Sequence, residues 1–208
     1  MTVHDLTHTI RNDMPVYPGT EQPRLTTACT IDDCGYRETL LHMFSHTGTH
    51  MDAPAHMLRG GAPLDSYDAA GFTGRAVVVD CRGQSAITLP LLQSYDLSGA
   101  EFLLFCTGWD KKWGSPDYYR DFPCLTAEAA AYVASLPLKG IGEDTISLDP
   151  CDSTDYPNHM TLLAADFVNT ENLTGLEPLA GKTVTFFTLP LKFENADGCS
   201  CRAIALEE

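Results

Sequence analysis

The apolar residues of this chain gather in short, β-branched runs that are separated by segments carrying helix signals. Such runs predict strands over residues 75–81, 101–106, 183–188 and 202–206. A weaker strand is predicted over residues 39–46, where the chain leads into a histidine-rich stretch. These short runs predict a sheet with several strands.

Three short helices are predicted between these strands. Pro90 suits the first turn of a helix over residues 89–92. Thr126 is a suitable N-cap for a helix over residues 127–135, and Pro137 ends it. A third helix is expected from about residue 159 to residue 167. Strands interspersed with short helices predict an α/β fold. No repeat or low-complexity linker divides the chain, so one domain over residues 1–208 is expected.

Composition and charge exclude several classes of partner. The hydrophobic content of 44% supports a folded core, and the net charge of −15 makes binding to nucleic acid or anionic membranes improbable. The longest apolar stretches fall far short of the roughly 20 residues that span a bilayer. Residues 1–5 do not resemble the start of a signal peptide, so a cytoplasmic location is expected.

The eight cysteines form no CxxC pair, and with no secretion signal they are expected to be reduced and mostly buried. Cys199 and Cys201 are the closest pair and could form a soft metal site. No further cysteine or histidine lies near them in the sequence, so this is a minor alternative.

The strongest chemical feature is a cluster of four histidines and Asp52 within residues 42–56. Imidazole and carboxylate are preferred ligands of divalent metals such as zinc, manganese and iron. An extended backbone would point His50 and Asp52 to one side, and Gly48 permits a bend that brings His46 to the same ion. Pro54 would set His56 just outside the ligands, where a general base or acid belongs.

Spacing alone leaves other interpretations open. The cluster could be purely structural, or it could serve catalysis without a metal. His42 is the least involved of the four histidines, because it belongs to the weaker predicted strand. His159 and Glu171 do not stand out from background by spacing alone.

The segment HTGTHMDAPAH, residues 46–56, resembles the HxGTHxDxPxH signature of the cyclase-family metal hydrolases. This family includes the bacterial kynurenine formamidases and the isatin hydrolases. The resemblance covers nearly the whole chain, through weaker motifs at residues 5–10, 14–19, 107–109, 142–149 and 197–202. Two positions depart from the family pattern. Ser200 stands where proline is usual, and Glu143 replaces a commonly apolar residue.

This resemblance implies a swivelling β/β/α type of fold and assembly into a homodimer or homotetramer. It implies one or two divalent ions per subunit, zinc or manganese. His46, His50 and Asp52 match the ligands of one ion, and Asp52 would bridge to a second ion. The other ligands of that second ion would be His159 and Glu171, and His56 matches the family's catalytic histidine.

The substrate implied by the resemblance is a small-molecule amide. N-formyl-L-kynurenine, hydrolysed to L-kynurenine and formate in tryptophan breakdown, is the leading hypothesis. The nearest alternative is a hydrolase that opens a cyclic amide such as isatin. A metal-dependent isomerase or dehydratase and a non-catalytic metal-binding protein also stay open. Four aromatic residues could form a wall of the substrate pocket or be ordinary packing: Trp109, Trp113, Tyr118 and Tyr119.

Overall fold

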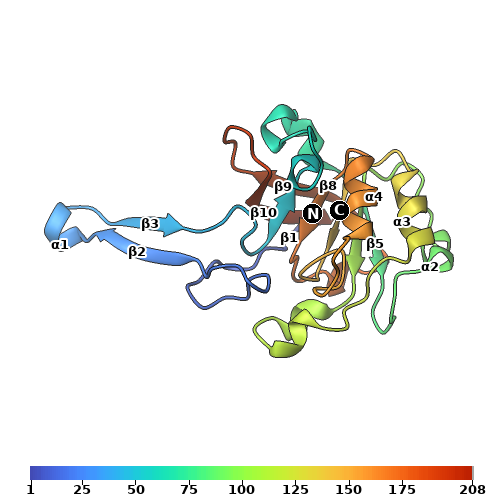
Figure 1. The fold of residues 1–208 in the computed structure, drawn as a ribbon, viewed down its shortest axis with the longest axis horizontal. Coiled ribbons are helices and arrows are strands. Elements are labelled where there is room, and N and C mark those ends of the chain that lie inside the picture. The colour runs from blue at the N-terminus through green and yellow to red at the C-terminus, as the bar shows by residue number, and fades with distance from the viewer. Residues whose placement is uncertain (208) are drawn as a thin grey trace.

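The computed structural model describes residues 1–207, which are built around one curved, mixed sheet (Figure 1). β9 pairs with both β5 and β10, so the sheet closes on itself. The neighbouring strands from β5 to β8 are parallel, and the other pairings are antiparallel. In pairing order, the strands are β1 (Thr2–Asp5), β10 (Gly198–Glu207), β4 (His50–Asp52), β8 (Val168–Glu171), β7 (Gly140–Glu143), β6 (Phe102–Cys106), β5 (Thr73–Asp80) and β9 (Thr183–Pro190).

Both faces of the central strands are buried, because side chains alternate between two apolar clusters. On β5, Ala76 and Val78 face the cluster enclosed by the sheet. Val77 and Val79 face a second cluster, which residues of three helices complete. These helices are α2 (Leu89–Gln93), α3 (Ala127–Ala134) and α4 (Pro157–Ala164), and they lie together on one side of the sheet (Figure 1).

The predicted α/β fold is confirmed, and its elements differ from the predictions mainly at their ends. All four strongly apolar runs are strands, and the Thr88 and Thr126 hydroxyls cap α2 and α3. The third helix was placed too late, because α4 begins at Pro157 and ends before Phe167. Proline suits the first turn of a helix, and this signal was overlooked. The short strands β1, β4, β7 and β8 were missed because they hold few apolar residues in a row.

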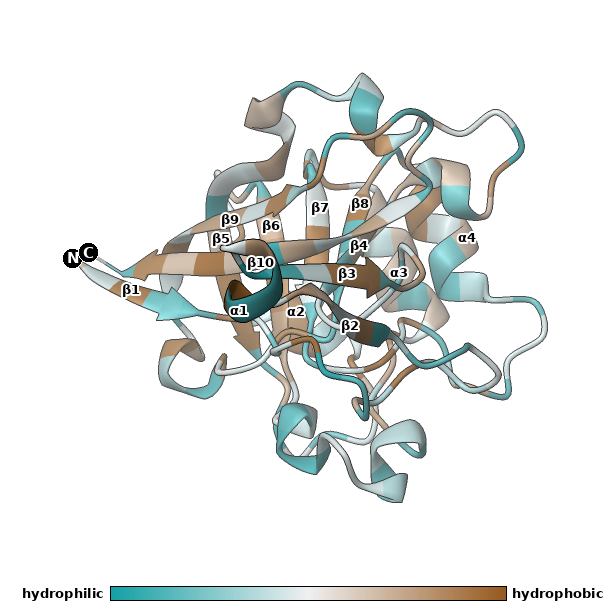
Figure 2. Cartoon of the chain, turned by 90° about the vertical axis from the view of Figure 1, so that its left-hand side faces the viewer, coloured by the Kyte–Doolittle hydropathy of each residue, from teal (hydrophilic) through white to brown (hydrophobic). Residues whose placement is uncertain are grey.

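A hairpin projects far from the rest of the protein and forms an arm (Figure 1). It consists of β2 (Arg24–Cys29), α1 (Ile31–Cys34) at the tip, and β3 (Glu38–His42). The weaker strand predicted over residues 39–46 corresponds to β3, which ends at His42. Leu40 and Leu41 on β3 are exposed, so the arm has no apolar core of its own. Figure 2 shows hydrophobic colouring on β3. An isolated two-stranded hairpin is marginally stable in water.

Within residues 1–207, none of the helices has the length and apolar character needed to cross a bilayer.

Candidate functional site

The histidine cluster is positioned by a bend and a short strand. Gly48 has a φ of +68°, a conformation that favours glycine, and it turns the chain between His46 and β4. β4 is extended, so His50 and Asp52 lie on one face while Met51 points into the core. Across the sheet, His50 pairs with Glu171 of β8. The sheet therefore brings Glu171 to the histidine cluster.

Two histidines are held so that one ring nitrogen of each faces the same carboxylates. The Nδ1 atom of His50 lies 2.9 Å from the carbonyl oxygen of Gly48, and His159 Nδ1 lies 2.7 Å from the Asp149 carboxylate. When Nδ1 donates these hydrogen bonds, Nε2 carries the lone pair that a metal needs. Asp149 belongs to the 142–149 motif, but the sequence did not reveal that it orients His159.

The free nitrogens and carboxylate oxygens of these residues converge in one buried space. His50 Nε2 lies 3.3 Å from Asp52 Oδ1 and 3.6 Å from Glu171 Oε2. His159 Nε2 lies 3.7 Å from Asp52 Oδ2 and 3.2 Å from Glu171 Oε1. Asp52 and Glu171 therefore stand between the two histidines. His159 and Glu171, which spacing alone did not distinguish, are brought into the cluster by α4 and β8.

His46 and His56 lie side by side on the other side of Asp52, with ring centroids 3.9 Å apart. His46 Nδ1 lies 2.6 Å from Asp52 Oδ1, and His46 Nε2 lies 3.0 Å from Asp197 Oδ2. His56 follows Pro54 in a single 3-10 turn, and its Nδ1 lies 3.9 Å from Asp197. Asp197 thus serves both rings. Asp197 belongs to the motif at residues 197–202, but the sequence does not indicate that it contacts His46 and His56.

The remaining members of the sequence cluster and the cysteines lie apart from these groups. His42 is exposed on the arm. Cys199 and Cys201 are buried in the core within β10, and neither belongs to any potential metal-binding group among residues 1–207. A soft metal site at these cysteines is therefore not supported. Ser200, which departs from the family pattern, donates a hydrogen bond to the Thr47 carbonyl and so ties down the loop beside His46.

The carboxylates of the site raise the pKa values of the histidines beside them. Burial alone would lower the pKa of His46, but Asp52 and Asp197 outweigh burial and raise it to about 9. Burial is likewise outweighed at His159, where Asp149, Asp52 and Glu171 raise the pKa to about 12. The site is thus rich enough in negative charge to hold protons on buried imidazoles. A bound cation would take the place of those protons.

The environment of His56 differs from that of the other two rings. Burial lowers the pKa of His56, although the Asp52 carboxylate opposes this effect. The imidazole is therefore neutral at pH 7 and is able to accept a proton. About 29% of the His56 side chain is exposed, so a ligand in the pocket has access to it.

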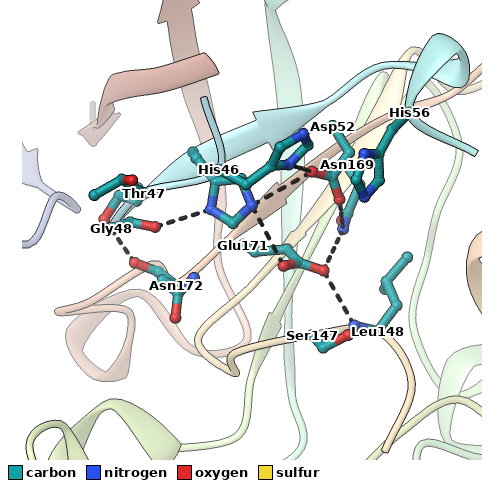
Figure 3. Close-up of polar contacts among 12 residues, drawn as sticks. His46, Thr47, Gly48, Asp52, His56, Ser147, Leu148, Asn169, Glu171 and Asn172 are labelled. Atoms are coloured by element: carbon teal, nitrogen blue, oxygen red, sulfur yellow. Dashed lines mark hydrogen bonds and ion pairs between the residues drawn. The ribbon is translucent and has the colours of Figure 1, made fainter. Parts of the chain in front are cut away.

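The buried amide of Asn169 lies next to Asp52 and Glu171 (Figure 3), and the sequence gives no sign of it. Asn169 Nδ2 lies 3.4 Å from Asp52 Oδ2, 3.1 Å from Glu171 Oε1 and 3.3 Å from Glu143 Oε1. Burial and the nearby Glu171 carboxylate raise the pKa of Glu143 well above its usual range. This shift favours the protonated form of Glu143, which would spare the site a further negative charge. Asn169 and Asp52 are paired across β8 and β4, and the sequence alone does not reveal this register.

These groups lie at one end of a pocket of about 690 Å³. Its walls come from the N-terminal segment, the base of the arm and the loop before α4, including Tyr17, Phe44, Ile146 and Tyr156. The four aromatic residues suggested by the sequence do not line this pocket. Instead they pack around Phe122 and Ile146 in a cluster that adjoins the pocket wall through Ile146 and Tyr17: Trp109, Trp113, Tyr118 and Tyr119.

The donor set fits a divalent cation. Two groups of residues each hold ligand atoms within 4.8 Å of one another, and Asp52 belongs to both groups. One group is His46, Asp52 and His56, and the other is His50, Asp52 and Glu171. Oriented imidazoles and shared carboxylates are typical of zinc or manganese sites. The fold and the site thus define an α/β protein with a buried histidine–carboxylate centre that opens into a pocket.

Comparison with known proteins agrees with this class. A family model described as "Putative cyclase" matches residues 4–150. The kynurenine formamidase of Salinibacter ruber is 31% identical and is aligned over 98% of this chain and 97% of its own length. The chain belongs to the cyclase family, which confirms the resemblance found in the sequence.

Solved structures share the fold over nearly the whole chain. Isatin hydrolase A from Labrenzia aggregata has a TM-score of 0.88 at 26% identity, covering 100% of this chain and 94% of its own. A "predicted metal-dependent hydrolase" from Bacillus stearothermophilus has a TM-score of 0.82 at 28% identity, covering 98% of this chain and 97% of its own. These matches confirm that the α/β fold expected from the resemblance is that of solved metal-dependent hydrolases.

Proposed function

We propose that this protein is a metal-dependent amide hydrolase that converts N-formyl-L-kynurenine and water to L-kynurenine and formate. The observation that carries the proposal is the buried donor set around Asp52, with the neutral His56 beside it at the end of a pocket. The kynurenine formamidase of Salinibacter ruber, at 31% identity over almost the full length of both chains, supports the choice of substrate.

His46, His50 and Asp52 are the proposed ligands of one divalent ion, zinc or manganese. Asp52 also faces His159 and Glu171, which are the proposed ligands of a second ion. A divalent ion bound there supplies Lewis-acid activation of water and of the amide carbonyl group. Asn169 and Asp149 would hold the ligands in place through the hydrogen bonds described above.

His56 is the proposed general base and acid. Its imidazole is neutral and partly exposed to the pocket, so it can accept a proton from the attacking water. The resulting imidazolium lies near the Asp197 carboxylate, which stabilises the positive charge. His56 would then return the proton to the leaving nitrogen. Asp197 also holds the neighbouring His46 ring and keeps the two rings in contact.

The proposal includes one domain and assembly as a homodimer or homotetramer in the cytoplasm. The β2–β3 arm supports assembly, because its exposed leucines lack a partner within the described chain. All eight cysteines are free thiols, which is the state expected in a reducing compartment.

The test is hydrolysis of N-formyl-L-kynurenine by purified protein loaded with zinc or manganese. We expect turnover that a chelator abolishes and added metal restores. A protein that holds metal and leaves this substrate intact would contradict the proposed substrate.

Isatin is the second candidate substrate, because the fold matches isatin hydrolase A with a TM-score of 0.88. Ring opening of isatin is measured in the same assay series. Activity on isatin without activity on the formamide would favour the cyclic amide. If neither amide is hydrolysed by the metal-loaded protein, isomerase and dehydratase reactions become the leading hypotheses.

A further inference from the structure

Tyr156 adopts a backbone conformation that tyrosine rarely uses. Its φ of 45° and ψ of 55° lie in the left-handed region, where the Cβ atom crowds the backbone. The following Pro157 restricts the preceding residue further. Glycine or asparagine would adopt this conformation at lower cost. A strained, bulky residue at a pocket points to a function for its side chain.

The side chain of Tyr156 lies in the wall of the pocket that contains His56, His159 and Glu171. Its ring stands edge-on to the His159 ring, with the centroids 6.2 Å apart and the planes at 89°. Tyr156 immediately precedes α4, the helix that carries His159. The strained residue therefore places an aromatic ring next to the proposed metal ligands.

A second tyrosine supports this ring from a distant part of the chain. Tyr17 lines the same pocket, and its hydroxyl donates a hydrogen bond to the Cys151 carbonyl at 3.3 Å. Cys151 lies in the same segment before α4 as Tyr156. Tyr17 thus ties this segment to the N-terminal part of the pocket wall.

The rest of the pocket wall combines apolar side chains with a few polar ones, such as Thr20 and Glu21. Apolar side chains of Val16, Phe44, Met57 and Ile146 contribute to the wall. No lysine or arginine is among the residues that line the pocket within the described chain. Aromatic rings prefer to meet other rings edge-on or offset, and such pairs are selective for aromatic over aliphatic groups.

We propose that Tyr156, supported by Tyr17, is a specificity-determining residue that contacts the aryl ring of the substrate. The enzyme would then prefer amides that carry an aromatic ring over amides of the same size without one. This inference rests on the proposed amide hydrolysis for its substrate class. The preference itself is a property of binding and can be measured without turnover.

The experiment compares two amides of similar size, benzamide and cyclohexanecarboxamide, by NMR titration of the metal-loaded protein. Wild type is expected to bind benzamide more tightly. Tyr156→Gly should lower this preference by about 3-fold to 10-fold, in line with the usual strength of an aromatic pair. Tyr156→Phe keeps the ring and should keep the preference. Tyr156→Asn removes the ring in a residue that tolerates the same backbone conformation, and it should behave like the glycine variant.

Two further measurements separate the possible outcomes. The thermal midpoint of Tyr156→Gly should match or exceed that of wild type, because the substitution relieves backbone strain. Hydrolysis of formanilide and N-cyclohexylformamide should show the same loss of aryl preference in kcat/KM. If wild type binds benzamide selectively but leaves N-formyl-L-kynurenine intact, the proposed substrate is wrong and the inference stands. If the binding preference is absent from wild type or unchanged in Tyr156→Gly, the inference is wrong.

Discussion

At the scale of single residues, the site depends on which nitrogen of each histidine is already occupied. His50 and His159 use Nδ1 for Gly48 and Asp149, so their Nε2 atoms face Asp52 and Glu171. His56 has no such close partner, and its nearest carboxylate contact is 3.9 Å away at Asp197. This difference separates the proposed ligands His50 and His159 from the proposed proton carrier, whereas His46 contacts carboxylates through both ring nitrogens.

His56→Ala tests that separation. The variant should keep its metal, because His56 is not one of the proposed ligands, but lose on the order of 10²-fold or more in kcat. Metal content by mass spectrometry and initial rates on N-formyl-L-kynurenine provide the two readouts. His50→Ala is the contrasting variant and should lose metal and activity together. Near-normal turnover in His56→Ala would remove this residue from the mechanism.

His8 gives a pH dependence that is independent of catalysis. Its ring stacks on Trp113 with centroids 3.8 Å apart, and burial lowers its pKa to about 4 despite the nearby Asp110. Between the usual value of 6.5 and about 4, the unfolded chain therefore binds more protons at this site than the folded chain. The stability associated with neutral His8 is present above pH 6.5 and is lost as the pH falls towards 4.

His8→Phe removes the titrating group and keeps a ring against Trp113. The thermal midpoint of this variant should fall less steeply than that of wild type between pH 6.5 and pH 4. Scanning calorimetry at several pH values measures the slope. Parallel slopes for His8→Phe and wild type would show that His8 does not contribute.

At the scale of elements, the His46 ring lies against the start of β10, where this strand pairs with β4. Gly198 pairs with Asp52 across these strands. A Cβ atom at Gly198 would lie 2.2 Å from His46 Cε1 and 2.7 Å from the Met51 carbonyl oxygen. The glycine is thus required by the His46 ring and not by its own backbone angles. The adjacent Asp197 contacts Nε2 of the same ring, so two neighbouring residues at the start of β10 position His46.

Gly198→Ala should therefore displace His46 and weaken metal binding by about 10-fold or more, the usual effect of disturbing groups that hold a ligand. Competition with a chromophoric chelator measures the affinity. Gly71→Ala is the control, because a Cβ atom there would meet nothing closer than 3.7 Å. Equal metal affinity in Gly198→Ala and wild type would contradict this role of the glycine.

At the scale of the whole molecule, the β2–β3 arm is the feature that the isolated chain does not explain. Leu40 and Leu41 are 61% and 53% exposed on adjacent positions of β3, and adjacent strand residues point to opposite faces. Both faces of the arm therefore present apolar side chains. The base of the arm also contributes Phe44 to the pocket wall, so the proposed assembly surface lies close to the pocket.

The double variant Leu40→Asp, Leu41→Asp should be a monomer, whereas wild type should be a dimer or tetramer. The charges would oppose burial of the arm against a second copy. Sedimentation velocity over a range of concentrations measures the assembly state. Leu191→Asp, at an exposed leucine outside the arm, is the control and should assemble like wild type. Identical sedimentation of the double variant and wild type would exclude the arm from the interface.

The sequence by itself determined the family, the α/β class, the strands β5, β6, β9 and β10, and the starts of α2 and α3. These features depend on local signals, such as apolar runs, threonine caps and the closely spaced residues 46–56. The bend at Gly48 was also predictable, because glycine acts on the backbone over a few positions.

Only the tertiary structure decided which distant residues join the cluster. Asn169 reaches Asp52 because β8 pairs with β4 in a particular register, and Asp197 reaches His46 because β10 lies beside β4. The aromatic residues of the pocket proved to be Tyr17, Phe44 and Tyr156, which lie far apart in the sequence. A sheet can pair its strands in many orders and registers, and no local pattern selects among them, so these contacts arise only when the whole sheet closes.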